Sequence, residues 1–170
     1  MRFQIYLLLG LASLAACSPT FNWRDVRPDG ARLSLLMPCK PDKAQKTVAM
    51  GGAPAELMLL SCDAGGVTFA LAFTDVKDIA KTAPALAQWQ SVTLANMKAA
   101  PNPATQAIKL TGLPTGAVLV KATGLRPNGQ AVSSQAAYFV QGTQVFQAVM
   151  YADKIAPDVA ETFLSGLKFE

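Results

Sequence analysis

Short apolar runs separated by turn residues set the strongest limit on the fold of this 170-residue chain. Glycine pairs stand at 51–52 and 65–66, and clusters with proline or glycine stand at 114–116, 127–129 and 141–143. Such residues adopt the backbone angles that tight turns require. The runs between them are short enough to pair as antiparallel neighbours. The sequence therefore predicts a sheet built largely from hairpins.

The runs between the turns have the period of strands with one buried face. In the clearest of them, Val67, Phe69, Leu71 and Phe73 alternate with smaller or polar residues. Strict alternation of this kind is typical of a strand that covers a core on one side. The predicted strands are 31–37, a weaker one at 46–50, 55–62, 67–74, 107–113, 118–125, 131–140 and 144–151, with a last extended segment at 167–169.

Two segments break the strand pattern and predict helices. The first covers residues 83–100, where Pro84 suits the first helical position and Pro101 ends the helix. The second begins at Pro157 and ends at Gly166. Strands, a long helix, more strands and a terminal helix predict an α+β domain, with an antiparallel β-sheet flanked by two helices.

Four segments occur in a distinctive order, at 30–38, 67–74, 110–116 and 163–169. This order resembles that of the photosystem PsbP family and its bacterial relatives. The resemblance implies a PsbP-like α/β/α sandwich, the fold of a Ran-binding nuclear import factor, and an accessory or binding role. It includes no catalytic motif, and no functional residue is carried over from it, because a shared fold does not fix function.

The N-terminal 16 residues are similar to an export signal. Arg2 precedes an apolar run that closes on the small residues Ala15 and Ala16, directly before Cys17. The apolar run has about a dozen residues, whereas a helix needs about 20 to cross a membrane. The expected organisation is therefore a cleaved signal peptide at 1–16, a leading segment at 17–30 and a single domain at 31–170.

The sequence Leu-Ala-Ala-Cys at 14–17 resembles the lipobox of bacterial lipoproteins. The resemblance implies a thioether-linked diacylglycerol on the Cys17 sulfur and acylation of the new amino terminus. Several acyl chains at one point give durable membrane attachment. Ser18 in the following position favours the outer membrane, facing the periplasm, over the inner one. The alternatives are an ordinary signal peptide with a coincidental cysteine and a retained anchor helix.

Cys39 and Cys62 form an even pair once Cys17 carries lipid. In an exported protein an even pair predicts a disulfide. Cys39 follows the first predicted strand and Cys62 ends the third, so a disulfide requires those two strand ends to be neighbours. The alternative is a catalytic thiol, but its usual activating partner is histidine, and the chain has 0 histidine residues.

The lack of histidine also narrows the enzyme chemistry open to the chain. It excludes Ser-His-Asp catalysis and HExxH zinc sites, so we expect no metal, no cofactor and no enzymatic activity. A hydrolase built on paired carboxylates is the remaining enzyme hypothesis, with Glu56, Asp63, Asp75 and Asp78 as candidates. For Asp75 and Asp78 the alternative is that they cap or complement the start of a helix.

The net charge of +4 is mild. The early basic residues are interleaved with acidic ones, which predicts a solvated mixed surface rather than a dedicated anion site. Nothing resembles a nucleic-acid-binding module, so we expect no nucleic-acid partner. The basic residues are Arg24, Arg27, Arg32, Lys40, Lys43 and Lys46, and the acidic ones are Asp25, Asp29 and Asp42.

Trp23 stands only a few residues after Cys17. One interpretation places its ring at a membrane interface or against a partner. The favoured interpretation is that Trp23 and Val26 anchor the mature N-terminus onto the sheet as a short leading strand.

The leading functional prediction is a non-enzymatic, lipid-anchored envelope protein that binds another envelope protein or supports an assembly. A carrier of lipids or small hydrophobic molecules is the first alternative, because 51% of the residues are hydrophobic. A wide apolar pocket would favour the carrier, and a filled core with an exposed apolar patch would favour the binding module. The aromatic residues that are candidates to line a cavity are Trp89, Phe139, Phe146 and Tyr151.

Overall fold

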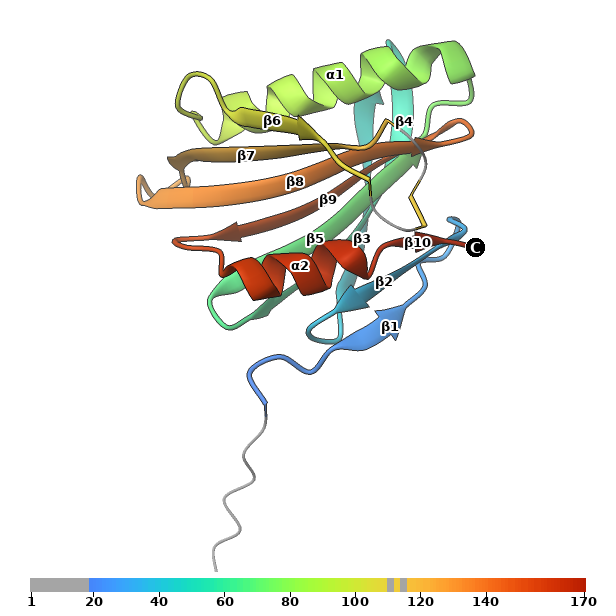
Figure 1. The fold of residues 1–170 in the computed structure, drawn as a ribbon. Helices are drawn as coiled ribbons and strands as arrows, with labels where there is room; N and C mark the ends of the chain where they lie inside the picture. Colours follow the sequence, from blue (N-terminus) through green and yellow to red (C-terminus); the bar gives the residue numbers. More distant parts are fainter. Residues whose placement is uncertain (1–18, 110–111, 114–115) are drawn as a thin grey trace, which may run out of the picture.

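The computed structural model describes residues 19–109, 112–113 and 116–170, whose main element is a seven-stranded antiparallel sheet (Figure 1). The strands lie in the order β3-β4-β5-β9-β8-β7-β6, so most neighbours in space are also neighbours in sequence. The expected signal peptide and Cys17 fall outside the described residues. The strand bounds are β3 Asp42–Met50, β4 Ala53–Ala64, β5 Val67–Asp75, β6 Ala104–Ala107, β7 Val118–Leu125, β8 Ala131–Gln141 and β9 Gln144–Ala152.

The two glycine pairs form the tight hairpins that the sequence predicts. Gly51 and Gly52 connect β3 to β4 with φ angles of 62° and 81°. Gly65 and Gly66 connect β4 to β5 with φ angles of 58° and 76°. Positive φ at both central residues is the conformation of a two-residue hairpin turn and favours glycine. These turns fix the register of β3, β4 and β5.

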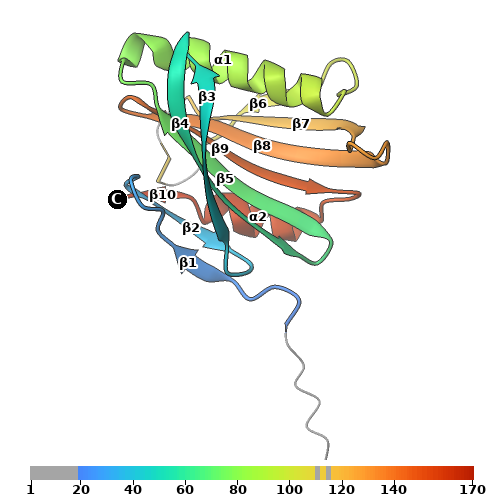
Figure 2. The same ribbon diagram turned by 180° about the vertical axis from the view of Figure 1, so that it is seen from behind.

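A second, smaller sheet lies beside the first (Figure 2). It consists of β1 (Arg24–Val26), β2 (Leu33–Met37) and β10 (Lys168–Phe169), in the order β1-β2-β10. The predicted leading strand therefore exists, but it pairs antiparallel with β2 in this small sheet rather than with the main sheet. Strand β1 therefore makes part of the expected leading segment 17–30 a component of the folded structure.

The two helices cover opposite faces of the seven-stranded sheet (Figures 1 and 2). Helix α1 (Ile79–Asn96) packs on the face formed by small residues of β5, including Ala70 and Ala72. Helix α2 (Pro157–Ser165) packs on the other face, together with β2. The chain is thus α+β, with a large antiparallel sheet flanked by two helices, as the sequence predicts.

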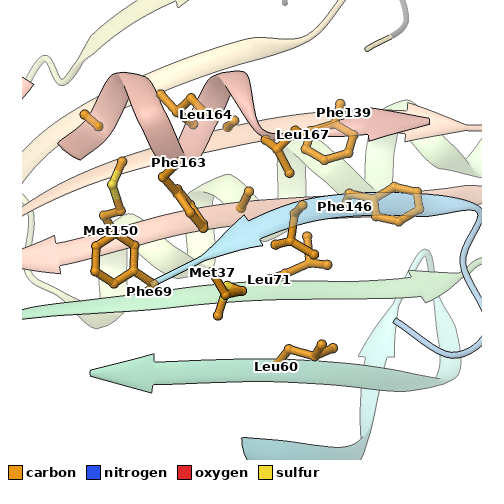
Figure 3. Packing of buried hydrophobic residues seen from close by; sticks show 14 of the residues in the cluster. Met37, Leu60, Phe69, Leu71, Phe139, Phe146, Met150, Phe163, Leu164 and Leu167 are labelled. Carbon is orange, nitrogen blue, oxygen red and sulfur yellow. The ribbon is translucent and has the colours of Figure 1, made fainter. Parts of the chain in front are cut away.

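Aromatic and branched side chains fill the space between the main sheet, α2 and the small sheet (Figure 3). The rings of Phe139 and Phe146 are stacked with centroids 5.1 Å apart, and Phe73 lies 5.6 Å from Phe146. The Phe69 and Phe163 rings meet edge to face at 5.3 Å. Interdigitation of this kind is typical of a close-packed core.

The predicted boundaries of the first helix are wrong. Helix α1 begins at Ile79 because the Asp78 carboxylate accepts a hydrogen bond of 2.9 Å from the Ala80 N–H and caps the helix start. Pro84 consequently lies inside the helix rather than at its first position. The helix ends at Asn96, earlier than predicted, because the Met97 carbonyl accepts a hydrogen bond from the Leu125 N–H on β7.

The predicted strand at 107–113 is also wrong. The strand in this region is β6, which ends at Ala107 opposite Val118. Beyond it, the Gly112 carbonyl accepts a hydrogen bond of 2.9 Å from the Phe169 N–H, so the chain has left β7 to reach the C-terminal strand. Residues 110–111 and 114–115, which fall in the predicted strand and turn, are outside the described residues.

Candidate functional site

Strand β3 forms one edge of the main sheet, and among the described residues no strand pairs with its outer side (Figure 2). Residues 42–47 of this strand are exposed. An edge strand presents backbone N–H and C=O groups that can pair with another chain, and lysines on such a strand limit unspecific pairing. Lys43 and Lys46 lie on β3. The backbone groups on this edge are therefore free to pair with a strand of a partner. Lys43 and Lys46 disfavour unspecific pairing with other chains.

An apolar groove of about 250 Å³ lies between β3 and α1, and we call it the β3–α1 groove. Val48 and Met50 of β3 and Leu57 of β4 form its sheet side, and Trp89 and Val92 form its helix side. Trp89 is 9% exposed and completes the core, whereas Val92 is 48% exposed. Lys46 also lines the groove, and no acidic residue in the described part of the chain does. The groove offers apolar contacts together with one positive charge.

The groove follows from two sequence periods that meet at the edge of the sheet. Lys46, Val48 and Met50 are two residues apart, so strand alternation places their side chains on the α1 side. Trp89 and Val92 are three residues apart, so both lie on neighbouring positions of the helix surface. The sequence predicts the helix that carries Trp89 and Val92. It also predicts the strand at 46–50 that carries Lys46, Val48 and Met50, but not residues 42–45 of β3, which have no apolar face.

Glu56 and Asp75, two of the four candidate catalytic carboxylates, line one open hollow of about 420 Å³, together with Asp29. Hydrogen bonds from the Thr47 hydroxyl at 2.6 Å and the Gln45 amide at 2.8 Å lower the pKa of Glu56. The hydrogen bond from the Lys77 ammonium at 2.8 Å lowers the pKa of Asp75. A carboxylate pair for hydrolysis needs one acid with a raised pKa. The arrangement therefore does not supply a general acid.

The other two candidate carboxylates have local structural partners. Asp63 accepts a hydrogen bond from the Thr68 hydroxyl, and Asp78 caps α1. The capping interpretation is confirmed for Asp78, while Asp75 accepts a hydrogen bond from the Lys77 N–H just before the helix. Within residues 19–109, 112–113 and 116–170, no group of three or more metal-ligating side chains is placed to hold a metal ion.

Cys39 and Cys62 are joined in a disulfide, as predicted, with their Cα atoms 6.1 Å apart. Cys39 follows β2, and Cys62 pairs with Phe69 between β4 and β5. The bond therefore ties the small sheet to the main one. Because both sulfur atoms are used in it, neither cysteine serves as a thiol nucleophile.

The four aromatic residues considered as cavity walls do not surround one cavity. Phe139 and Phe146 are stacked in the filled core. Trp89 lines the β3–α1 groove, and Tyr151 lines a separate open hollow of about 340 Å³ near the end of α1.

A polar network lies beneath α1. The Gln147 amide donates hydrogen bonds to the Tyr138 hydroxyl at 2.8 Å and to the Thr93 hydroxyl at 3.1 Å. Burial raises the pKa of Tyr138, and burial together with the nearby Tyr138 raises the pKa of Tyr151 to about 12. Burial therefore favours the neutral form of both phenols.

We expect the Tyr151→Phe variant to lose less stability than the wild type between pH 10 and pH 12. In the unfolded chain a tyrosine ionises near pH 10, but folded Tyr151 keeps its proton up to about pH 12. The contribution of Tyr151 to the free energy of unfolding is complete below pH 10. It falls as the pH rises from 10 to 12, by up to about 2.7 kcal/mol. Urea unfolding at several pH values measures the difference between the variants, and parallel curves would contradict it.

The first aromatic residues of the described chain pack onto the core. The Trp23 ring lies 5.9 Å from the Phe69 ring and 5.8 Å from the Phe21 ring. Phe21 also covers the turn at Gly65, where a Cβ atom would come within 2.5 Å of its ring. The favoured interpretation of Trp23 as an anchor onto the folded structure is thus supported by its contacts.

Comparisons with known proteins do not assign the chain to a family. No protein-family model matches the sequence, and no curated protein matches it. Among solved structures, the chain is similar to PA94 from Pseudomonas aeruginosa, a protein of unknown function. The sequences are 15% identical, the match covers 81% of this chain and 85% of that one, and the TM-score is 0.42. We base no functional argument on that similarity.

Neither α1 nor α2, nor any other helix in the described part of the chain, is long and apolar enough to cross a bilayer.

Proposed function

We propose that this protein is a lipid-anchored envelope protein whose domain binds an extended segment of another envelope protein. The observation that carries the proposal is the exposed outer edge of β3 directly beside the β3–α1 groove. A free strand edge next to an apolar groove suits recognition by strand addition, in which the backbone gives affinity and alternate side chains give specificity.

The groove defines the chemistry of the partner segment. A strand added to β3 would point every second side chain toward α1. Val48, Leu57 and Val92 offer apolar contacts to those side chains, and Lys46 offers a positive charge. The expected segment is therefore extended, carries one or two apolar side chains and includes an acidic residue that faces Lys46.

Lipidation at Cys17 is the other half of the proposal. It rests on the lipobox-like sequence at 14–17 and on Ser18, which favours the periplasmic side of the outer membrane. The similarity to the PsbP family agrees with an accessory role and stays a prediction. The carrier is a weaker alternative, because Phe139 and Phe146 fill the core and the hollows described above are open. The carboxylate hydrolase is weaker still, for want of a general acid.

A photo-crosslinking amino acid placed on β3 in living cells tests the binding surface. We expect a probe at Ala49 to capture one envelope protein, and a probe at Thr105 on the opposite edge strand β6 to capture none. Mass spectrometry of the crosslinked peptide identifies the partner segment. The Cys17→Ala variant should leave the membrane fraction and lose most of the product.

A matched pair of helix variants separates specific docking from chance contact. Val92 lines the groove, whereas the neighbouring Ser91 is exposed and does not. Val92→Lys should weaken binding of the identified segment by about tenfold, the equivalent of about 1.4 kcal/mol, and Ser91→Lys should leave it unchanged. Equal capture from β3 and β6, or equal binding by both variants, would refute this surface. Recovery of lipid without protein would favour the carrier.

A further inference from the structure

We infer that a second cleft, at the end of the sheet far from β3, binds a phosphate ester. This cleft has a volume of about 370 Å³. Its floor is formed by β7 and β8, and its walls by the loop at 101–103 and the segment that follows β9. We call it the Lys121–Lys154 cleft, after the two lysines that line it.

Strand alternation explains how the polar side chains gather there. Leu119 of β7 and Phe139 of β8 belong to the core cluster shared with α2, on the face of the sheet that carries that helix (Figure 1). Lys121, Ser133 and Gln135 are each an even number of residues from one of these core residues on the same strand, so they project from the same face. Lys121 and Gln135 are paired directly across β7 and β8.

The charges in the cleft are uncompensated. Lys121 and Lys154 both line it, no acidic side chain does, and within the described residues neither lysine forms an ion pair. The nearest acidic residue in the sequence, Asp153, is turned to Arg126, with which it forms an ion pair of 3.2 Å. Its backbone carbonyl accepts a hydrogen bond from the Ser133 hydroxyl. Asp153, the residue before Lys154 in the sequence, therefore does not neutralise the charge of Lys154.

Two basic residues near the N-terminus, Arg27 and Lys43, show the contrast. Arg27 contacts both Asp25 at 3.3 Å and Glu170 at 3.2 Å, and Lys43 contacts Asp29 at 2.7 Å. Those cations are neutralised, which agrees with the mixed-charge surface that the sequence predicts there. The lysines of the cleft are 33 positions apart in the sequence, so no local pattern would have revealed the pair.

The lining selects the class of anion. Two lysines attract a negative charge, while the hydroxyl of Thr123 and the amides of Asn102 and Gln135 suit a ligand with several polar atoms. The space exceeds that of a bare ion, so the ligand expected is a phosphate joined to a polar group such as glycerol. That chemistry occurs both in soluble phosphate esters and in the head groups of anionic phospholipids.

Binding measurements on the purified full chain test the cleft with two probes. One is glycerol 3-phosphate, followed by calorimetry, and the other is vesicles of phosphatidylglycerol with phosphatidylcholine, followed by co-sedimentation. A lysine near an anionic surface contributes about 1 kcal/mol, which corresponds to about fivefold in affinity. We therefore expect the Lys121→Gln/Lys154→Gln variant to bind about 25-fold more weakly.

The Lys81→Gln variant is the matched control, because it removes the same charge from the exposed start of α1, outside the cleft. It should bind both probes within about twofold of the wild type. Loss with both probes, or with glycerol 3-phosphate alone, assigns a phosphate-ester site. Loss with vesicles alone assigns a lipid head group. The inference is overturned if neither probe binds the wild type, or if the double variant and the control bind alike.

Discussion

The Phe69→Ala variant is expected to lose about 3–5 kcal/mol of its free energy of unfolding, the range for large aromatic truncations in a core. Phe69 is fully buried on β5 and joins three parts of the molecule. Its ring lies 5.3 Å from Phe163 of α2, 5.9 Å from Trp23 and 6.3 Å from Phe21. Removing it leaves a cavity and releases the N-terminal segment from the core. Urea unfolding followed by circular dichroism measures the loss.

Two further variants show whether the cavity or the N-terminal contact dominates that loss. Phe69→Leu keeps an apolar side chain in place and should lose less than half as much stability. Phe21→Ala removes only the outer ring and should cost less than either. If Phe21→Ala were as damaging as Phe69→Ala, the stability would come from the N-terminal segment rather than from the core around Phe163.

Removing the disulfide should cost about 3–4 kcal/mol, because the bond closes a loop across a sequence separation of 23 residues in the unfolded chain. The Cys39→Ala/Cys62→Ala variant and the reduced wild type should unfold at similar urea concentrations, well below that of the oxidised protein. For a domain with a typical total of about 5–15 kcal/mol, this is a large share.

Thiol labelling tests whether the disulfide is present. Labelling of the unfolded, unreduced chain should leave Cys39 and Cys62 unmodified. A wild type that unfolds at the same urea concentration with and without reductant would contradict the prediction, and so would labelling of both residues.

Local signals account for most of the elements that the sequence predicts correctly. The glycine pair at 51–52 forms its hairpin within four residues, so neighbouring residues are enough to reveal it. The second helix begins at Pro157 and is capped by Gly166 directly after Ser165, in agreement with the prediction, because both signals are also local. The disulfide was predictable because Cys39 and Cys62 are an even pair once Cys17 is set aside, and because both lie near the ends of predicted strands.

Contacts between distant residues account for what the sequence misses. The first half of β3 has no apolar face and is a strand because β4 pairs with it throughout. The predicted strand after Ala107 fails because the chain departs toward Phe169, more than fifty residues away in the sequence. The β3–α1 groove and the Lys121–Lys154 cleft each combine side chains from segments that no sequence period connects.

The docking of Phe21 on the turn at Gly65 also limits where a partner can be. Only residues 18–20 separate Phe21 from Cys17, and an extended chain spans at most about 3.6 Å per residue. In the lipidated protein the fixed part of the domain would then lie within roughly 14 Å of the acylated cysteine. This N-terminal segment is too short for the domain to reach a protein embedded in the opposite membrane. A partner anchored in the same bilayer would therefore meet this protein by diffusion within one plane, at a rate set by the density of both in that plane.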